Sequence, residues 1–231
     1  GNVAVPKSID TGRPENLAEA VGINLLLLGL FAVQHSIMAR PAFKRWWSGV
    51  LPVAAQRSTY VLLSSLILLL LYWQWRPIPM QIWRVDGIAA WVLIGVFWLG
   101  WLITFASSYM IDHFELFGLS QAFSALRGAK APGQSFKTPL LYKVVRHPIM
   151  LGFIIAFWAT PVMTIGHLFF SVMTTAYILV AVKFFEERDL KKLYGEVYVR
   201  YQREVPMLLP FRKKNSAASS PSAKSKPLST H

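Results

Sequence analysis

The segment YKVVRHPIMLG, from Tyr142 to Gly152, combines residue types that a binding site for a charged molecule needs. Pro148 suits the first position of a helix, where its missing N–H costs nothing. Arg146 and His147 are therefore expected just before the N-terminus of an apolar helix. Gly152 lets either a ligand or a neighbouring helix approach the backbone closely. An interfacial Arg–His pair that only anchors the helix start explains the pattern equally well.

A second polar group, EERD, begins at Glu186 and stands at the end of another apolar run. A carboxylate among aromatic rings suits a ligand with a cationic centre, through charge attraction and cation–π contacts. An amphipathic helix in the headgroup region would explain the tyrosines but not the pair of glutamates. Continued as a helix, the segment carries on one face a carboxylate followed by aromatic rings: Glu187, Tyr194, Tyr198 and Tyr201.

Two further groups contain histidine. IDHFELFGLSQ directly follows an apolar run and includes Asp112 and His113, either of which could act as a base; ordinary solvated loop charges are the alternative. His35 lies on an otherwise apolar stretch, where a hydrogen-bonded packing histidine is an equally good interpretation. Polar residues in or beside membrane spans are costly, so each of these groups is a candidate site.

The elements that must position these groups are membrane helices. Apolar residues make up 54% of 231 positions and charged residues 15%, whereas a soluble domain carries about a quarter charged residues. A bilayer core needs roughly 20 residues of helix. We therefore expect an all-α integral membrane protein with about five spans, the last two forming a hairpin with a tight turn at 161–166. The spans are expected at residues 20–38, 59–76, 88–106, 148–163 and 166–184.

Outside the transmembrane domain at 20–185, the chain is expected to have an extracytoplasmic segment at 1–19 and an amphipathic cytoplasmic cofactor-binding helix at 186–210. The Ser-, Lys- and Pro-rich tail at 211–231 is too polar to pack, and we expect it to be disordered. Basic residues favour the cytoplasmic side, which places the N-terminus outside and the C-terminus inside. The exceptions among 24 Lys and Arg are Lys7, Arg13, Arg76 and Arg84.

This topology brings all four polar groups to the cytoplasmic face, which predicts a single site that lies between the helices. The net charge of +13 is explained by basic loops against anionic lipid, without nucleic acid. Because cysteine is absent, disulfides, thiolate metal sites and cysteine nucleophiles are excluded. No metal site is expected, and the oligomeric state stays open.

Segments of this sequence resemble two groups of known proteins. RHPIMLG, followed by a hairpin and EERDLKKLYGEVYVRYQREVPMLLP, is similar to the isoprenylcysteine carboxyl methyltransferase superfamily. QHSIMARPAFKRWW and SSYMIDHFELFGLSQ resemble its bacterial methanethiol S-methyltransferases, so the likeness covers about residues 33–210. It implies a bacterial inner-membrane enzyme that methylates a small thiol, above all methanethiol to dimethyl sulfide, with S-adenosyl-L-methionine. The implied cofactor-binding residues are Tyr142, Arg146, His147, Pro148, Gly152, Glu186, Glu187, Tyr198 and Tyr201.

Methyl transfer to sulfur requires the thiolate, so a nearby base, or an electrostatic field that favours the anion, should help. The candidates are His113, His35 and Asp112 as base, with Arg146 favouring the anion. A GxGxxG loop is absent, which excludes a soluble Rossmann methyltransferase. The alternatives are another thiol, a prenyl-cysteine carboxylate (less favoured because Met150 stands where the superfamily often has Tyr) or a non-enzymatic denitrification-associated membrane protein. A transporter is disfavoured by spans without mid-membrane charge, and a haem protein by the lack of closely spaced histidine pairs.

Overall fold

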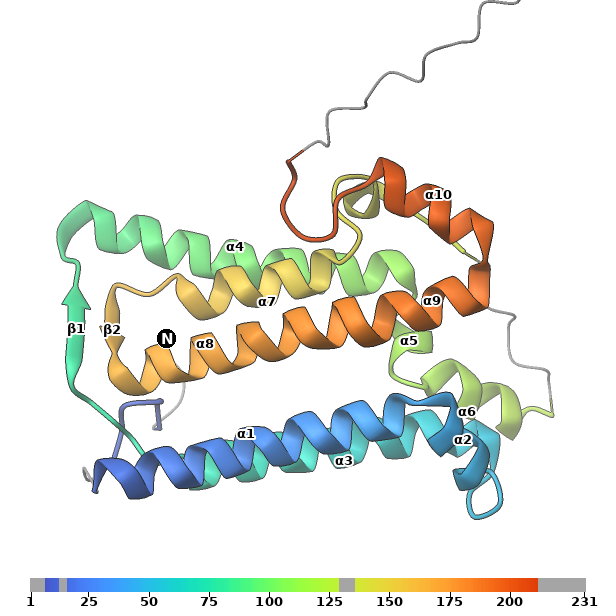
Figure 1. Ribbon diagram of the computed structural model, residues 1–231, viewed down its shortest axis with the longest axis horizontal. Coiled ribbons are helices and arrows are strands. Elements are labelled where there is room, and N and C mark those ends of the chain that lie inside the picture. Colours follow the sequence, from blue (N-terminus) through green and yellow to red (C-terminus); the bar gives the residue numbers. More distant parts are fainter. Residues whose placement is uncertain (1–6, 13–15, 129–135, 212–231) are drawn as a thin grey trace, which may run out of the picture.

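Long apolar helices dominate the computed structural model, which describes residues 7–12, 16–128 and 136–211 (Figure 1). Four of them are long and apolar enough to cross a membrane, and a shorter apolar helix, α7 (Pro148–Trp158), accompanies them. The protein is therefore an all-α integral membrane protein, as its composition predicts. The four long helices are α1 (Leu17–Ala39), α3 (Val53–Gln74), α4 (Gly87–Ile111) and α8 (Ile165–Val180), which continues without a break to Tyr194.

The helices form two groups that run parallel to a common axis (Figure 1). α1 packs on α3, with the short helix α2 (Pro41–Trp47) in the connection between them. In the other group α7 lies against α4 along its length, and α8 runs beside α7. The segment between α7 and α8 differs from the predicted tight turn at 161–166, because it contains a strand, β2 (Val162–Thr164). α7 consequently ends at Trp158 rather than at 163.

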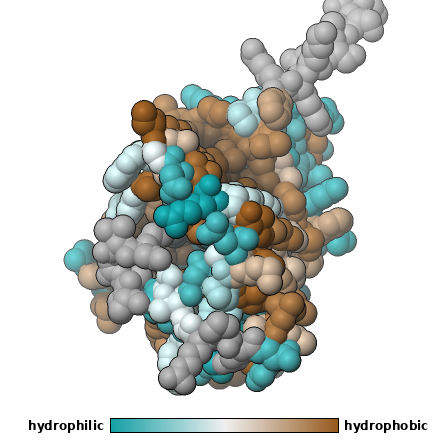
Figure 2. Space-filling model, turned by 90° about the vertical axis from the view of Figure 1, so that its left-hand side faces the viewer, coloured by the Kyte–Doolittle hydropathy of each residue, from teal (hydrophilic) through white to brown (hydrophobic). Residues whose placement is uncertain are grey.

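A two-stranded ribbon closes one end of the molecule. β1 (Gln81–Arg84) pairs antiparallel with β2, and Gln81 lies opposite Thr164. The side chain of Thr164 also donates a hydrogen bond to Asp10 in the N-terminal segment, at 2.6 Å. Figure 2 views this end and shows hydrophilic side chains gathered on it, beside the hydrophobic sides of the helices. We call it the β end, and the opposite end the α10 end.

The α10 end carries the polar groups that the sequence singles out. The loop expected after α4 is folded into α5 (His113–Leu116) and α6 (Leu119–Leu126). The helix expected over 186–210 is two helices, because Gly195 adopts a φ of +56° and turns the chain. They are α9 (Glu187–Tyr194) and α10 (Glu196–Glu204). The π-helical segment η2 (Ala181–Glu186) directly precedes α9, and the short 3₁₀ helix η1 (Leu140–Lys143) lies before α7. Of the predicted tail at 211–231, all but Phe211 lies outside the described residues.

The crossing of α4 and α7 is made by backbone atoms. A Cβ added at Gly152 would lie 2.6 Å from the carbonyl oxygen of Gly100, and one added at Gly100 would lie 2.7 Å from the backbone nitrogen of Ala156. Small residues allow this close approach between membrane helices. Of the two interpretations that the sequence leaves open for Gly152, the structure shows the approach of a neighbouring helix.

Enlarging this contact should destabilise the protein. Gly100→Leu forces the two helices apart, and overpacking of this kind costs about 1–3 kcal/mol or more. We expect a clearly lower melting temperature in a thermal-shift measurement on detergent-purified protein. Gly95→Leu is the matched control on the same helix, since a Cβ there meets open space. Equal melting temperatures for the two variants would contradict a tight crossing at Gly100.

Candidate functional site

Glu187 is the centre of a polar network at the α10 end. Arg146 donates from Nε to Glu187 Oε1 at 2.7 Å, and its Nη2 lies 2.5 Å from the same oxygen. His147 Nε2 lies 3.2 Å from Oε1, while Gln202 donates to Oε2 at 2.9 Å. The Arg146 and Glu187 side chains are only 9% and 12% exposed. One nearly buried carboxylate thus joins the start of α7 to α9 and α10, through charge-assisted hydrogen bonds that are stronger than neutral ones.

Arg146 also fastens the segment that follows α10. Its Nη1 donates to the carbonyl oxygens of Gln202, at 3.1 Å, and Val205, at 2.5 Å. Its backbone N–H donates to Pro206 O at 2.9 Å, and that of the next residue, His147, donates to Met207 O at 3.1 Å. All three guanidinium nitrogens are therefore engaged by the protein itself. These contacts join the start of α7 to the segment that follows α10.

The π-helical segment η2 determines how the two neighbouring glutamates are presented. Both reach the same histidine, because His147 Nδ1 lies 3.5 Å from Glu186 Oε1 while its Nε2 faces Glu187. π-Helical turns are rare and occur frequently at functional sites. The two carboxylates differ in accessibility, since the Glu186 side chain is 45% exposed. Glu186 is thus the more accessible of the two carboxylates, while Glu187 is held by the buried network.

His147 is held in its charged form by these neighbours. It is the residue before α7, and its side chain is buried. Burial alone would lower its pKa, but hydrogen bonds and charge attraction from Glu186 and Glu187 outweigh burial and raise the pKa to about 9. The imidazolium is therefore the main form at neutral pH, which neutralises part of the negative charge of the two carboxylates.

The raised pKa of His147 predicts a pH-dependent stability. In the unfolded chain the pKa of histidine is about 6.5, so the stabilisation is fully present below that pH and is lost as the pH rises through about 9. We expect the melting temperature of the wild-type protein to fall between about pH 7 and about pH 10. His147→Gln should flatten this part of the curve. An unchanged slope in the variant would show that other groups cause the decline.

An aromatic cluster lies beside the network. The ring of Phe136 lies with its centroid 5.0 Å from that of Tyr194, 5.4 Å from Tyr201 and 6.0 Å from Tyr198. Burial raises the pKa of Tyr201 to about 12, so its hydroxyl stays protonated and donates to Tyr142 O at 2.5 Å. Tyr198 is 1% exposed, and its hydroxyl has no hydrogen-bond partner within the described part of the chain. A buried donor without a partner is costly, which suits a site that a polar ligand completes.

His35 occupies a second polar cluster, between α1, α3 and α8. The hydroxyl of Tyr60 lies 2.9 Å from His35 Nδ1, and Ser64 Oγ lies 3.4 Å from the same atom. The ring of Phe31 stacks on the imidazole at 5.1 Å, and Tyr177 closes the cluster at 6.5 Å. The carboxylate of Glu186 acts electrostatically on both His35 and Tyr60. The negative charge of Glu186 therefore acts at the His35 cluster as well as at His147.

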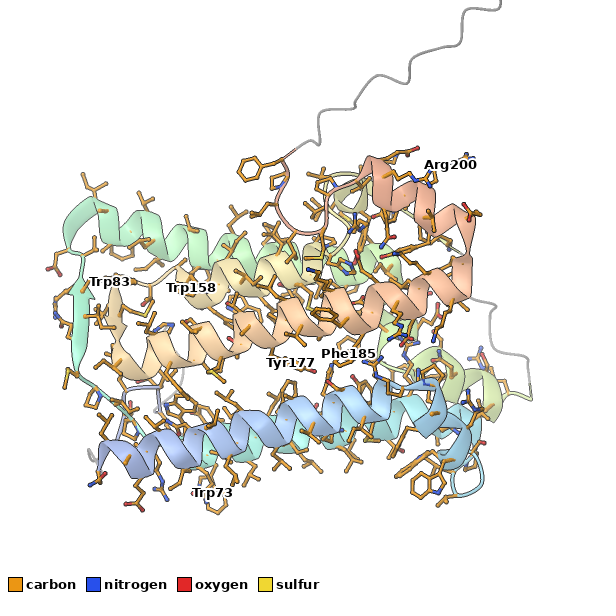
Figure 3. The ribbon with its side chains drawn as sticks, viewed as in Figure 1. Trp73, Trp83, Trp158, Tyr177, Phe185 and Arg200 are labelled. Atoms are coloured by element: carbon orange, nitrogen blue, oxygen red, sulfur yellow. The ribbon has the colours of Figure 1, made fainter. Side chains whose placement is uncertain are left out.

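The two helix groups are joined beside this cluster. Figure 3 shows Tyr177 and Phe185 between the continuous α8–α9 helix and α1. Tyr177 Oη lies 3.1 Å from Ser36 Oγ. Arg40 lies over the ring of Phe185 at 3.9 Å and pairs with Asp189 at 3.2 Å. These contacts hold α1 against the helix that carries both glutamates.

The remaining sequence candidates are placed differently. The ring of His113 stacks on Tyr109 at 4.2 Å, and its Nδ1 lies 3.1 Å from Ser108 Oγ. Asp112 is exposed and accepts a hydrogen bond from the backbone of Glu115, so it caps α5. Neither contacts the Glu187 network. Pro148 is buried at the first position of α7, as expected for a helix start.

Sequence reasoning did not single out several residues that the structure places in or beside the polar network, the aromatic cluster and the His35 cluster: Phe136, Gln202, Tyr60, Tyr177 and Phe185. Each is a common residue type that lies far along the chain from its partners, so only the fold reveals it. Gln202 alone had an indirect indication, because it is the neighbour of Tyr201 on the predicted polar helix.

Comparison with known proteins gives a consistent set of relatives. The chain is 70% identical to methanethiol S-methyltransferase 2 of Bradyrhizobium diazoefficiens over 91% of its own length and 81% of the relative. It is 54% identical to the methanethiol S-methyltransferase of Mycobacterium tuberculosis, over 91% of its length and 86% of the relative. Nurim of Rattus norvegicus is 33% identical, over 82% of this chain and 75% of that protein. No protein-family model and no solved structure matches the chain.

Proposed function

Because the chain belongs to the methanethiol S-methyltransferase family, we propose that it transfers a methyl group from S-adenosyl-L-methionine to methanethiol, forming dimethyl sulfide. The observation that carries the site assignment is the difference in contacts and exposure between Glu186 and Glu187. Glu187 is bound by Arg146, His147 and Gln202, whereas the Glu186 side chain is almost half exposed and its charge acts on both His147 and His35.

The residues present fit this methyl donor. Its sulfonium centre is positive, and a carboxylate with aromatic rings nearby attracts such a cation. Glu186 provides the open carboxylate, and the Phe136 cluster provides the rings. The hydroxyl of Tyr198, which has no hydrogen-bond partner among the described residues, offers a hydrogen bond to a polar group of the ligand. When bound, S-adenosyl-L-methionine supplies an electrophilic methyl group on sulfur.

The protein's own residues perform the rest of the mechanism. Glu187 holds Arg146 and His147, so that the turn before α7, helix α9 and helix α10 keep one geometry. Glu186 would attract the sulfonium of the bound donor, an attraction that exists only while the donor carries its positive charge. The acceptor thiol must lose its proton before its sulfur attacks. We assign that proton to His35, because the negative charge of Glu186 acts at His35, whereas Asp112 caps α5 and His113 stacks on Tyr109.

The distribution of basic residues also bears on the location of the protein in the cell. The excess of Lys and Arg around the α10 end supports a cytoplasmic position for this end, in a protein of a bacterial inner membrane whose N-terminus lies outside. A soluble methyl donor then reaches Glu186 from the cytosol. Methanethiol is small and apolar, and the His35 cluster lies on membrane-spanning helices, so the acceptor can reach it through the bilayer. The two substrates thus approach Glu186 from different directions.

The deciding experiment is headspace gas chromatography on detergent-purified protein supplied with S-adenosyl-L-methionine and methanethiol. We expect dimethyl sulfide only when both substrates are present. Binding of the donor by calorimetry without this product would redirect the search to other thiols. The absence of both product and donor binding would overturn the proposed function.

A further inference from the structure

Three polar contacts follow one another from the sulfur of Met38 to the ring of His35, across α1 and α3. Gln34 Nε2 lies 3.0 Å from the sulfur of Met38, one turn further along α1. The other end of the same amide, Oε1, lies 3.2 Å from Ser64 Oγ on α3. Ser64 Oγ lies in turn 3.4 Å from Nδ1 of His35. Met38 and Ser64 are both buried, so two side chains connect a buried sulfur atom to the imidazole.

The sulfur of Met38 determines the direction of these hydrogen bonds. A thioether has no hydrogen to donate, so the group of the Gln34 amide that faces it must be the NH₂. The carbonyl oxygen of Gln34 then faces Ser64, and the hydroxyl of Ser64 donates its single hydrogen to that oxygen. Ser64 therefore presents a lone pair to His35. A lone pair can accept a hydrogen bond from Nδ1 only if Nδ1 carries a proton.

The hydroxyl of Tyr60 does not distinguish between the two neutral forms of His35. It lies 2.9 Å from both ring nitrogens, and it can either donate a hydrogen bond or accept one. Tyr60 thus suits both tautomers, whereas Ser64 suits only one of them. We propose that Gln34 and Ser64 are positioning residues that hold neutral His35 in the tautomer with its proton on Nδ1. Nε2 is then the basic nitrogen, because the hydrogen bond made by one ring nitrogen sets the state of the other.

This tautomer determines which atom takes the proton of the acceptor thiol, a consequence that rests on the proposed function. A general base needs an unprotonated atom within reach of the proton that it removes. The S–H bond of the thiol breaks, its electron pair stays on sulfur, and the proton binds Nε2 of His35. The ring is then an imidazolium whose Nδ1–H still donates to Ser64. Ser64 and Gln34 therefore favour both the reactive tautomer and the charged form that follows it.

NMR of detergent-purified protein with ¹⁵N-labelled histidine tests the tautomer without any substrate. Protonated and unprotonated ring nitrogens give separate resonances, and the signals missing from His35→Gln assign those of His35. Spectra are recorded at rising pH until this ring is neutral. We expect a protonated Nδ1 and an unprotonated Nε2 in the wild-type protein.

Variants of the relay show whether Gln34 and Ser64 cause this preference. Ser64→Ala removes the acceptor for Nδ1, and Gln34→Met frees the hydroxyl hydrogen of Ser64, so both variants should populate both tautomers. Ser64→Thr keeps the hydroxyl and should behave like the wild type. Ser65→Ala is the matched control, because Ser65 is the exposed neighbour on the same helix. An unprotonated Nδ1 in the wild-type protein, or an unchanged tautomer in both Ser64→Ala and Gln34→Met, would overturn the proposal.

Headspace chromatography of the same variants tests the consequence for methyl transfer. We expect Ser64→Ala to lower kcat about tenfold or more, the usual effect of losing a hydrogen bond to a charged group. Ser64→Thr should recover the activity, and the affinity for S-adenosyl-L-methionine should stay unchanged in calorimetry. Full kcat in Ser64→Ala would overturn the positioning role in catalysis. Absence of methyl transfer by the wild-type protein would instead overturn the proposed function, while NMR would still decide the tautomer.

Discussion

Glu187→Ala is expected to weaken binding of S-adenosyl-L-methionine by at least about 100-fold and to lower the melting temperature. The substitution leaves Arg146 and His147, both nearly buried, without their shared carboxylate. Breaking a buried ion pair by removing one partner costs about 3–5 kcal/mol of folding stability, which accounts for the lower melting temperature. The start of α7, α9 and α10 then no longer keep the geometry proposed for the donor site, and a 100-fold loss of affinity corresponds to about 2.8 kcal/mol of binding free energy. Calorimetry and a thermal-shift measurement on the same purified variant report the two effects.

Glu186→Gln separates the role of the open carboxylate from that of the buried one. Glu186 contacts only His147 within the described network, and its side chain is almost half exposed. We therefore expect this variant to lose donor affinity and to lower the melting temperature less than Glu187→Ala does, because His147 keeps Glu187 as a partner. Glu196→Ala is the control, because Glu196 is exposed on α10. If Glu187→Ala kept full donor affinity, the network around Glu187 would not be part of the donor site.

The division of roles between the two glutamates is beyond what the sequence can predict. The pair EE marks this position as unusual, because carboxylates there oppose the basic bias of the same side. Which glutamate turns inward depends on the π-helical turn of η2 and on Arg146, which lies 41 residues away in the chain. Sequence spacing carries no information about either. The predicted aromatic face is a similar case, because its rings converge on Phe136 only after Gly195 turns the chain.

The membrane helices, in contrast, could be predicted well, because bilayer thickness imposes a minimum length on every apolar run. The expected spans at 20–38 and 88–106 lie within α1 and α4. The short run at 148–163 was the exception, since its end depends on β2 pairing with β1 from another part of the chain. Gly152 shows the same limit at the level of one residue. Its sequence context permits the close approach of either a ligand or a neighbouring helix, and only the position of Gly100 in the fold shows that a helix approaches.

The base is the assignment that the structure sharpens most. The sequence offers His113, His35 and Asp112 without an order among them. The structure uses Asp112 as a helix cap and stacks His113 on Tyr109, whereas it places His35 next to Tyr60 and within the field of Glu186. A methyl donor attracted to Glu186 would therefore have His35, rather than His113, on the acceptor side.

His35→Gln should accordingly lower kcat by about 10²–10⁴, the usual contribution of a general base, with donor affinity unchanged. His113→Ala should retain most of the activity. The deficit of His35→Gln should also shrink as the pH rises, because solvent then produces thiolate without a base. Headspace chromatography at pH values from about 7 upward, about one pH unit apart, measures this recovery. A deficit that is constant with pH would show that His35 supports packing of its aromatic neighbours, and a large loss in His113→Ala would move the base to α5.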